Sequence, residues 1–255
     1  MRRRSRVAEG PVLGVYAAGS LRMALTEVAE AFEQDHGIRI ALTFGASGLL
    51  KDRIMAGEDP QVFASANMEH PEGLLAAGKA VAVAAFARNT MCVLAAPWFS
   101  LQGKPLALRL LDDDVRLGTS TPRSDPSGDY AFDVFERIEA TGAAGTGSAA
   151  SLKRKSLQLT GAPDLPRPTT GRSIYGELVA TGQADAFLTY CTNAFLARSE
   201  QPGLQVLPVP AAINISARYG LALLAPVPAA ARAYADYLLG TRGQAILSSH
   251  GFSAP

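Results

Sequence analysis

Apolar and polar positions alternate along the chain in short blocks that predict strands and helices in succession. Residues 12–17 form an apolar run typical of a buried strand. After Ser20, apolar residues recur at helical spacing as far as Phe32. Residues 38–44 alternate in polarity, which predicts a second strand, and a second amphipathic segment begins at Ser47. Strand, helix, strand and helix in direct succession imply parallel pairing and an α/β sheet.

The same alternation continues to the C-terminus, without a repeat of about 20 to 50 residues. Further strands are expected at 62–66, 90–96, 115–119, 184–189, 204–209 and 220–224. Helices are expected before Gly78, from 128 to 138, at 172–181, from 191 onward, at 229–239 and at 243–249. Residues 106–111 are expected as a strand or turn with a short helix, and the small residues at 143–150 as a surface connection.

Three serines stand where an expected strand gives way to an expected helix. Ser20 and Ser127 are predicted N-caps, and Ser47 lies at a third helix start. The first N–H groups of a helix lack partners and carry partial positive charge. Helix starts aimed at one point would therefore form an anion site.

Composition narrows the class of protein. The 255 residues are 48% apolar and 18% charged, with a formal net charge of +1, which argues against disorder and against a nucleic-acid surface. Such a length permits one large domain or two of about 100 to 150 residues. No apolar run is long enough for a membrane span. The basic residues 2–6 are not followed by an apolar stretch of signal-peptide length, so 1–9 is expected to be a flexible tail.

Candidate chemistry is sparse outside the helix starts. Cys92 and Cys191 lack metal-site spacing, and either one disulfide or two buried thiols fits them. The three histidines are isolated, and the Gly-x-Ser-x motif around Ser47 lacks its final glycine. We therefore expect no catalytic residues, no metal site and no cofactor.

Four motifs occur in an order known from one family: Ala17-Ala-Gly-Ser20-Leu, Phe44-Gly-Ala-Ser47-Gly, Phe63-Ala-Ser-Ala-Asn67 and Gly243-Gln-Ala-Ile-Leu-Ser-Ser-His-Gly-Phe252. Over residues 12–253 the chain resembles the periplasmic molybdate-binding proteins of ABC transporters. The resemblance implies the type II periplasmic binding fold, with two α/β lobes joined by a hinge and a mixed, mostly parallel sheet in each. Lobe I is expected at 10–88 plus 216–255, and lobe II at 89–215. A periplasmic monomer that docks on a membrane permease is also implied.

The resemblance further implies a ligand set for a tetrahedral oxyanion, molybdate or tungstate. It places Ser20 and Ser47 on lobe I, Ser127 and Tyr190 on lobe II, and a backbone amide at Arg172 or Ser173. Such a site of donors alone should lack a carboxylate. Asn67, Arg88 and Asn193 are not expected to touch the ligand.

Three residues depart from the family pattern: Gln61 replaces an acidic residue, Arg172 replaces an apolar one, and Asp125 precedes Ser127 by two positions. An inward Asp125 would repel a dianion or accept a proton from phosphate. A guanidinium suits a carboxylate, so a small di- or tricarboxylate or another oxyanion is the alternative ligand. A ligand-sensing domain of a regulator and an acid/base or serine enzyme are the remaining alternatives.

Overall fold

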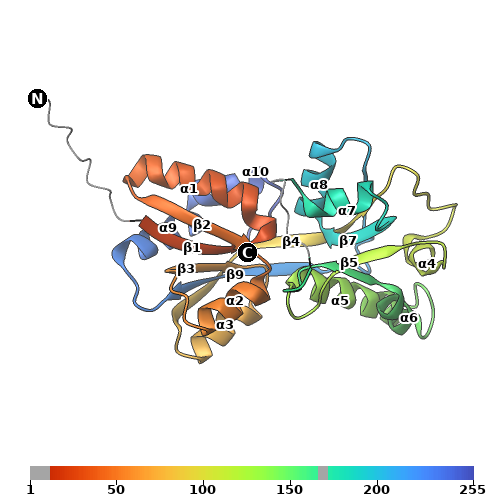
Figure 1. Cartoon of the computed structure of the whole chain (residues 1–255), viewed down its shortest axis with the longest axis horizontal. Helices are drawn as coiled ribbons and strands as arrows, with labels where there is room; N and C mark the ends of the chain where they lie inside the picture. Colours follow the sequence, from red (N-terminus) through yellow and green to blue (C-terminus); the bar gives the residue numbers. More distant parts are fainter. Residues whose placement is uncertain (1–11, 166–171) are drawn as a thin grey trace, which may run out of the picture.

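The computed structural model describes residues 12–165 and 172–255, and in this part of the chain two α/β lobes lie side by side (Figure 1). The strands follow the order β2-β1-β3-β9-β4-β7-β5-β6, with β8 paired to β4. The mixed α/β architecture expected from the alternation of strands and helices is confirmed.

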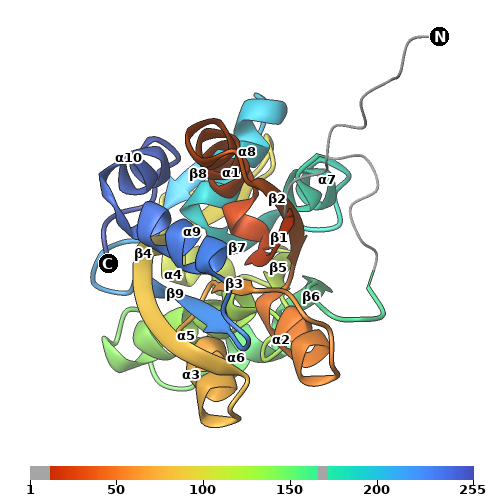
Figure 2. The same ribbon diagram turned by 90° about the vertical axis from the view of Figure 1, so that its left-hand side faces the viewer.

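The sheet of the first lobe begins with three parallel strands: β1 (Val12–Ala18), β2 (Arg39–Gly45) and β3 (Val62–Ser65). The antiparallel strand β9 (Ser216–Leu224) extends it. One face is covered by α1 (Arg22–His36), α9 (Ala229–Leu239) and α10 (Thr241–Ser249), and the other by α2 (Ser47–Met55) and α3 (Glu69–Ala76) (Figure 2). Apolar side chains from both helix layers are buried against this sheet.

The sheet of the second lobe contains β5 (Leu117–Ser120), β6 (Leu157–Thr160) and β7 (Ala186–Tyr190), which run parallel, and β8 (Gln205–Pro208). The helices α4 (Leu106–Leu111), α5 (Pro126–Ala140) and α6 (Ser148–Lys155) pack on one face. The helices α7 (Ile174–Ala180) and α8 (Cys191–Glu200) pack on the other.

A single long strand, β4 (Ala80–Ala95), belongs to both sheets. It pairs with β9 from Ala80 to Thr90 and with β7 from Met91 to Ala95, both antiparallel. The expected strand at 90–96 therefore starts ten residues too late, because the alanine-rich stretch before it gains its extended form from β9. The lobe boundaries at 88/89 and 215/216 stay a prediction.

Other differences from the expected elements concern short segments. Helix α6 starts within the small-residue stretch at 143–150, since Ala149 and Leu152 are buried. Strand β6 was not expected. Cys92 on β4 and Cys191 at the start of α8 form a disulfide, so the bridge rather than two thiols is present.

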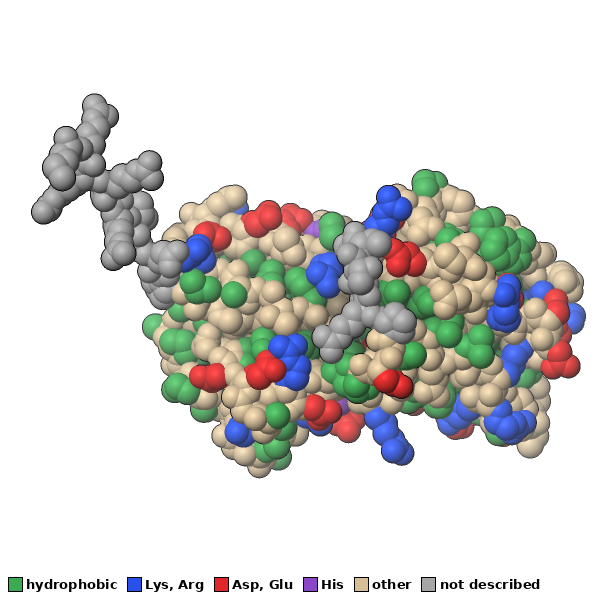
Figure 3. Space-filling view, in the orientation of Figure 1, with side chains coloured by type: hydrophobic (Ala, Val, Ile, Leu, Met, Phe, Trp, Pro, Cys, Tyr) green, Lys and Arg blue, Asp and Glu red, His purple; other side chains and the backbone are tan. Residues whose placement is uncertain are grey.

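Two further features bear on the class of protein. On the face seen in Figure 3, basic and acidic side chains are interspersed. Among the described residues, no helix is long and apolar enough to cross a membrane. The expected tail at 1–9 lies outside the residues that the structure describes.

Candidate functional site

A cavity of about 320 Å³ lies between the two lobes. Five of the six predicted ligand residues line it: Ser20, Ser47, Arg172, Ser173 and Tyr190. The sixth, Ser127, is not among the lining residues; it is fully buried, with its Oγ 3.4 Å from Thr189 Oγ1. Its role in binding stays a prediction.

Ser20 does not cap a helix, contrary to the expectation. Residues Gly19–Leu21 form one turn of 3-10 helix, and α1 starts after it at Arg22 without a side-chain cap. The intervening turn moves Ser20 away from the first amides of α1. Its Oγ instead lies 2.9 Å from the hydroxyl of Tyr219 on β9.

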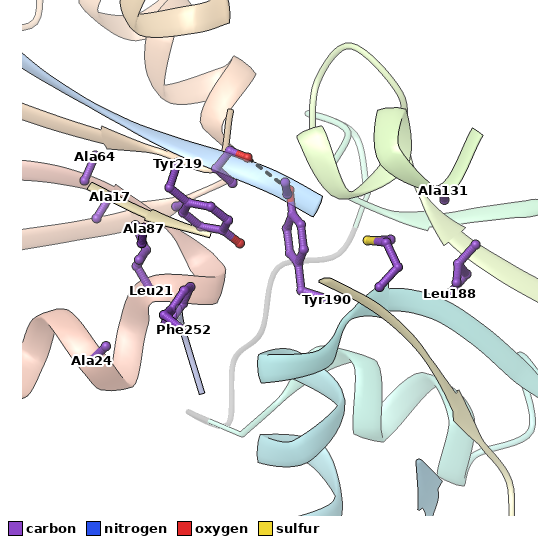
Figure 4. Close-up of a cluster of buried hydrophobic side chains, with 14 of the residues drawn as sticks. Ala17, Leu21, Ala24, Ala64, Ala87, Ala131, Leu188, Tyr190, Tyr219 and Phe252 are labelled. Atoms are coloured by element: carbon purple, nitrogen blue, oxygen red, sulfur yellow. Dashed lines mark hydrogen bonds between the residues drawn. The ribbon is translucent and has the colours of Figure 1, made fainter. Parts of the chain in front are cut away.

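The Ser20 hydroxyl is part of a chain of hydrogen bonds. Asn89 Oδ1 accepts from the Thr90 amide, so the Asn89 Nδ2 group faces Tyr219 and donates to its hydroxyl oxygen at 3.3 Å. Either hydroxyl of the Tyr219–Ser20 pair can be the donor, and Ser20 keeps its proton for a ligand when it accepts from Tyr219. Tyr219 and Tyr190 face each other at the junction of the lobes (Figure 4). Burial raises the pKa of both phenols, so both stay protonated.

The hydroxyl of Ser47 is left as a donor because its oxygen accepts a backbone hydrogen bond. Ser47 is the first residue of α2 rather than its cap, and its Oγ accepts from the Ala66 amide at 3.1 Å. The Ser47 proton therefore remains for a ligand. The hydroxyl of Tyr190 donates to Ala66 O at 3.3 Å, a bond that crosses from one lobe to the other (Figure 4).

The amides at three helix starts already have acceptors within the chain. Gly48 N donates to Ser124 O at 3.0 Å, across the lobes. Ser127 N donates to Asp125 Oδ1 at 3.0 Å, and Ser173 N donates to Glu200 Oε2 at 2.8 Å. The expectation that Ser127 caps α5 is therefore wrong: Asp125 is the cap, because its carboxylate is a stronger acceptor placed before the first turn.

Two carboxylates line the cavity, so the expectation of a site without carboxylates is also wrong. They belong to Asp125 and Glu200, and both are partly exposed. Burial raises the pKa of Asp125 to about 6, although the hydrogen bond from the Ser127 amide opposes the rise. Asp125 is thus a carboxyl group that exchanges its proton near neutral pH.

Three arginines also line the cavity. Arg172 is exposed, Arg22 stacks at 4.6 Å on the ring of Phe44, and Arg53 donates to both carboxylate oxygens of Glu58. Arg53 is thus balanced by Glu58, and the guanidinium groups of the wall supply N–H donors for an anion rather than a net positive charge.

Gln61, the remaining residue that departs from the family pattern, is not among the residues that line the cavity. Its Oε1 accepts from Gly14 N at 2.8 Å and so joins β1 to the segment before β3.

The cavity also includes a residue that was not expected near the ligand. Asn193 lines it, and its Nδ2 donates to Thr189 Oγ1. Nothing in the local sequence pattern points to Tyr219 or Asn89, because their role depends on strand pairing.

Within the described residues, no group of three or more His, Cys, Asp or Glu side chains is placed to hold a metal ion.

The comparisons with known proteins cover nearly the whole chain. Residues 13–253 match the family model for bacterial extracellular solute-binding proteins. An uncharacterized protein of Pasteurella multocida is 34% identical over 247 residues, 93% of this chain and 97% of its own. The molybdate-binding protein ModA of Mycobacterium tuberculosis is 28% identical over 255 residues, 96% of this chain and 88% of its own.

Two solved structures illustrate the likeness in fold. The periplasmic molybdate-binding protein of Azotobacter vinelandii has a TM-score of 0.71 at 20% identity and covers 95% of this chain and 99% of its own. The sulfate-binding protein SubI of Mycobacterium tuberculosis has a TM-score of 0.75 at 15% identity, with coverages of 96% and 87%. These likenesses show a two-lobed binding-protein fold.

Proposed function

This chain belongs to the family of bacterial extracellular solute-binding proteins, and from that premise we propose that it captures a small oxyanion between its lobes for an ABC importer. The observation that carries the proposal is the pair of serine hydroxyls at the cavity. Ser47 accepts a hydrogen bond from the Ala66 amide and so has a proton left to donate, and Ser20 has one when it accepts from Tyr219.

Molybdate and tungstate are the first ligands that we propose. Their tetrahedral oxygens accept hydrogen bonds in every direction, which suits a wall of hydroxyls and guanidinium groups. Each charge-assisted hydrogen bond contributes about 1.5 to 3 kcal/mol. The 28% identity to ModA over nearly the full length supports the choice.

The transport role that we propose includes a hinge motion of the lobes. β4 continues from one sheet into the other at the junction, where its last β9 pair is Thr90↔Ser216 and its first β7 pair is Met91↔Tyr190. Closure would form the Gly48–Ser124 and Tyr190–Ala66 hydrogen bonds, and the closed form would dock on the permease. We place the working protein outside the cytoplasmic membrane, as a monomer.

One observation favours a second ligand class. Arg172 lines the cavity, and a guanidinium grips a carboxylate with two parallel hydrogen bonds. A small di- or tricarboxylate held by Arg172 would keep the transport role and change the cargo.

The test is calorimetric titration of the full chain with molybdate, tungstate, sulfate, phosphate and citrate in parallel. We expect an oxyanion to bind, and the double variant Ser20→Ala with Ser47→Ala to lose that binding. Ser156→Ala is the control, because the Ser156 hydroxyl donates to Lys153 O at the end of α6, and Ser156 is not among the residues that line the cavity.

Two outcomes would contradict the proposal. Binding of citrate alone would transfer the role to the carboxylate alternative with Arg172 as its main contact. Oxyanion binding that survives loss of both serine hydroxyls would refute the ligand set.

A further inference from the structure

Asp125 is one of the two carboxyl groups on the cavity wall, and it is the one whose surroundings favour a proton. Its Oδ1 is occupied by the amide of Ser127, and its side chain lies over Gly161. A Cβ atom at position 161 would lie 2.6 Å from Asp125 Cβ and 3.0 Å from Asp125 Oδ2. Gly161 also has a φ of +89°, so glycine is required there on both counts, and it leaves room for the carboxyl group beside the cavity.

The groups around Asp125 come from both lobes. Asp129 on the same helix opposes its ionisation, and two phenols face it from α7 and β7. Burial raises the pKa of both phenols, so neither exchanges a proton near neutral pH. The ionisable side chains around Asp125 and along the cavity wall are Arg22, Arg53, Arg123, Asp129, Arg172, Tyr175, Tyr190 and Glu200.

We propose that the cleft binds its oxyanion with one proton shared between a ligand oxygen and the carboxyl oxygen Oδ2 of Asp125. The inference rests on the proposed function and specifies the form of the ligand that the site accepts. Two bare oxygens in contact would repel, whereas a proton between them forms a short, charge-assisted hydrogen bond. A fully deprotonated oxyanion takes this proton up from solution, and a hydrogen oxyanion such as HPO₄²⁻ brings its own.

The proton requirement makes affinity for sulfate and molybdate depend on pH. The pKa of Asp125 in the free protein is about 6, so each pH unit well above it reduces the protonated fraction tenfold. Between about pH 6.5 and about pH 8.5, affinity for a fully deprotonated oxyanion should fall on the order of fifty- to a hundredfold. Binding at about pH 8 should take up about one proton per ligand.

Calorimetric titration with sulfate and molybdate at several pH values tests this, using two buffers of different ionisation heat to count protons. The variant Asp125→Asn keeps an oxygen for the Ser127 amide and supplies a permanent NH₂ donor. We expect its affinity to be independent of pH and, at about pH 8.5, more than tenfold tighter than that of the wild type. Phosphate should bind the wild type at about pH 8 with almost no proton uptake.

Glu200→Gln is the matched control, because it removes a negative charge from the same cavity wall and leaves Asp125 in place. The dependence on pH should persist in this variant. If Asp125→Asn does not fold, the proton count on the wild type decides the question.

The failures of the two proposals are distinguishable. Sulfate or molybdate binding that is independent of pH, without proton uptake, would overturn the shared proton and leave the proposed function standing. A slope with pH that persists in Asp125→Asn would also overturn it. Failure of every oxyanion to bind at any pH would overturn the proposed function itself.

Discussion

Gly48→Ala should separate closure of the lobes from folding. Gly48 is the second residue of α2, and its amide donates to Ser124 O of the other lobe. A Cβ atom added there would lie 2.5 Å from Arg123 O and 2.7 Å from Ser124 O. Both oxygens belong to the backbone of lobe II, so rotation of a side chain does not relieve the clash.

The magnitude follows from three contributions. Alanine is favoured over glycine inside a helix by about 1 kcal/mol, so lobe I should be no less stable. Closure would lose the Gly48–Ser124 hydrogen bond, a cost of about 0.5 to 1.5 kcal/mol, and overpacking adds about 1 to 3 kcal/mol. We take about 2 kcal/mol against the closed form, which lowers ligand affinity about thirtyfold if binding requires closure.

The assay is titration with the oxyanion that the wild type binds, together with thermal unfolding and small-angle scattering with ligand present. Gly73→Ala is the matched control, since Gly73 lies in α3 and a Cβ atom there meets nothing within 4 Å. We expect Gly73→Ala to bind normally and Gly48→Ala to bind weakly with an unchanged or higher melting temperature. Equal affinities of the two variants would refute the reasoning, as would a loss of folding in Gly48→Ala alone.

Three further predictions concern single interactions. Tyr219→Phe removes the hydroxyl that bonds to Ser20, and oxyanion affinity should fall about tenfold in titration; an unchanged affinity would show that this bond does not contribute to binding. Replacing Cys92 and Cys191 together with alanine should lower the free energy of unfolding in urea by about 2 to 4 kcal/mol, because the bridge closes a loop of 99 residues; a loss below about 1 kcal/mol would contradict this. Burial raises the pKa of Asp185, but hydrogen bonds from the side chain and amide of Arg116 and from the Trp98 indole outweigh it and lower the pKa to about 2. The stability that this depressed pKa contributes is fully present above about pH 4 and is lost as the pH falls toward 2, so Asp185→Asn should cost about 2 kcal/mol at pH 7 and much less at pH 2; equal losses at both would refute it.

The pattern of residues was sufficient to predict the architecture, because it reflects local preferences. The apolar run at 12–17 and the alternation at 38–44 correspond to parallel strands β1 and β2. Since parallel strands end at one edge of a sheet, the residues that follow them gather there. Ser20 and Ser47 accordingly line one cavity.

Expectations about the partners of single groups were less successful. Ser127 was expected to cap α5, but Asp125, two residues earlier, occupies that position. Ser20 was expected to cap α1, but one turn of 3-10 helix separates it from that helix. Near a helix start several acceptors compete within a few residues, and sequence spacing alone does not rank them.

The sequence by itself determined the succession of strands and helices and the family resemblance. Only the tertiary structure decided that β4 spans both lobes, that Glu200 and Ser124 occupy helix-start amides, and that the hydroxyl of Tyr219 bonds to Ser20. Periodicity and turn chemistry act over a few residues, so one chain reveals them. The partner of a hydrogen-bonding group is set by residues far away in the sequence, such as Ser20 and Tyr219, which meet only when β9 joins the sheet that β1 and β3 begin.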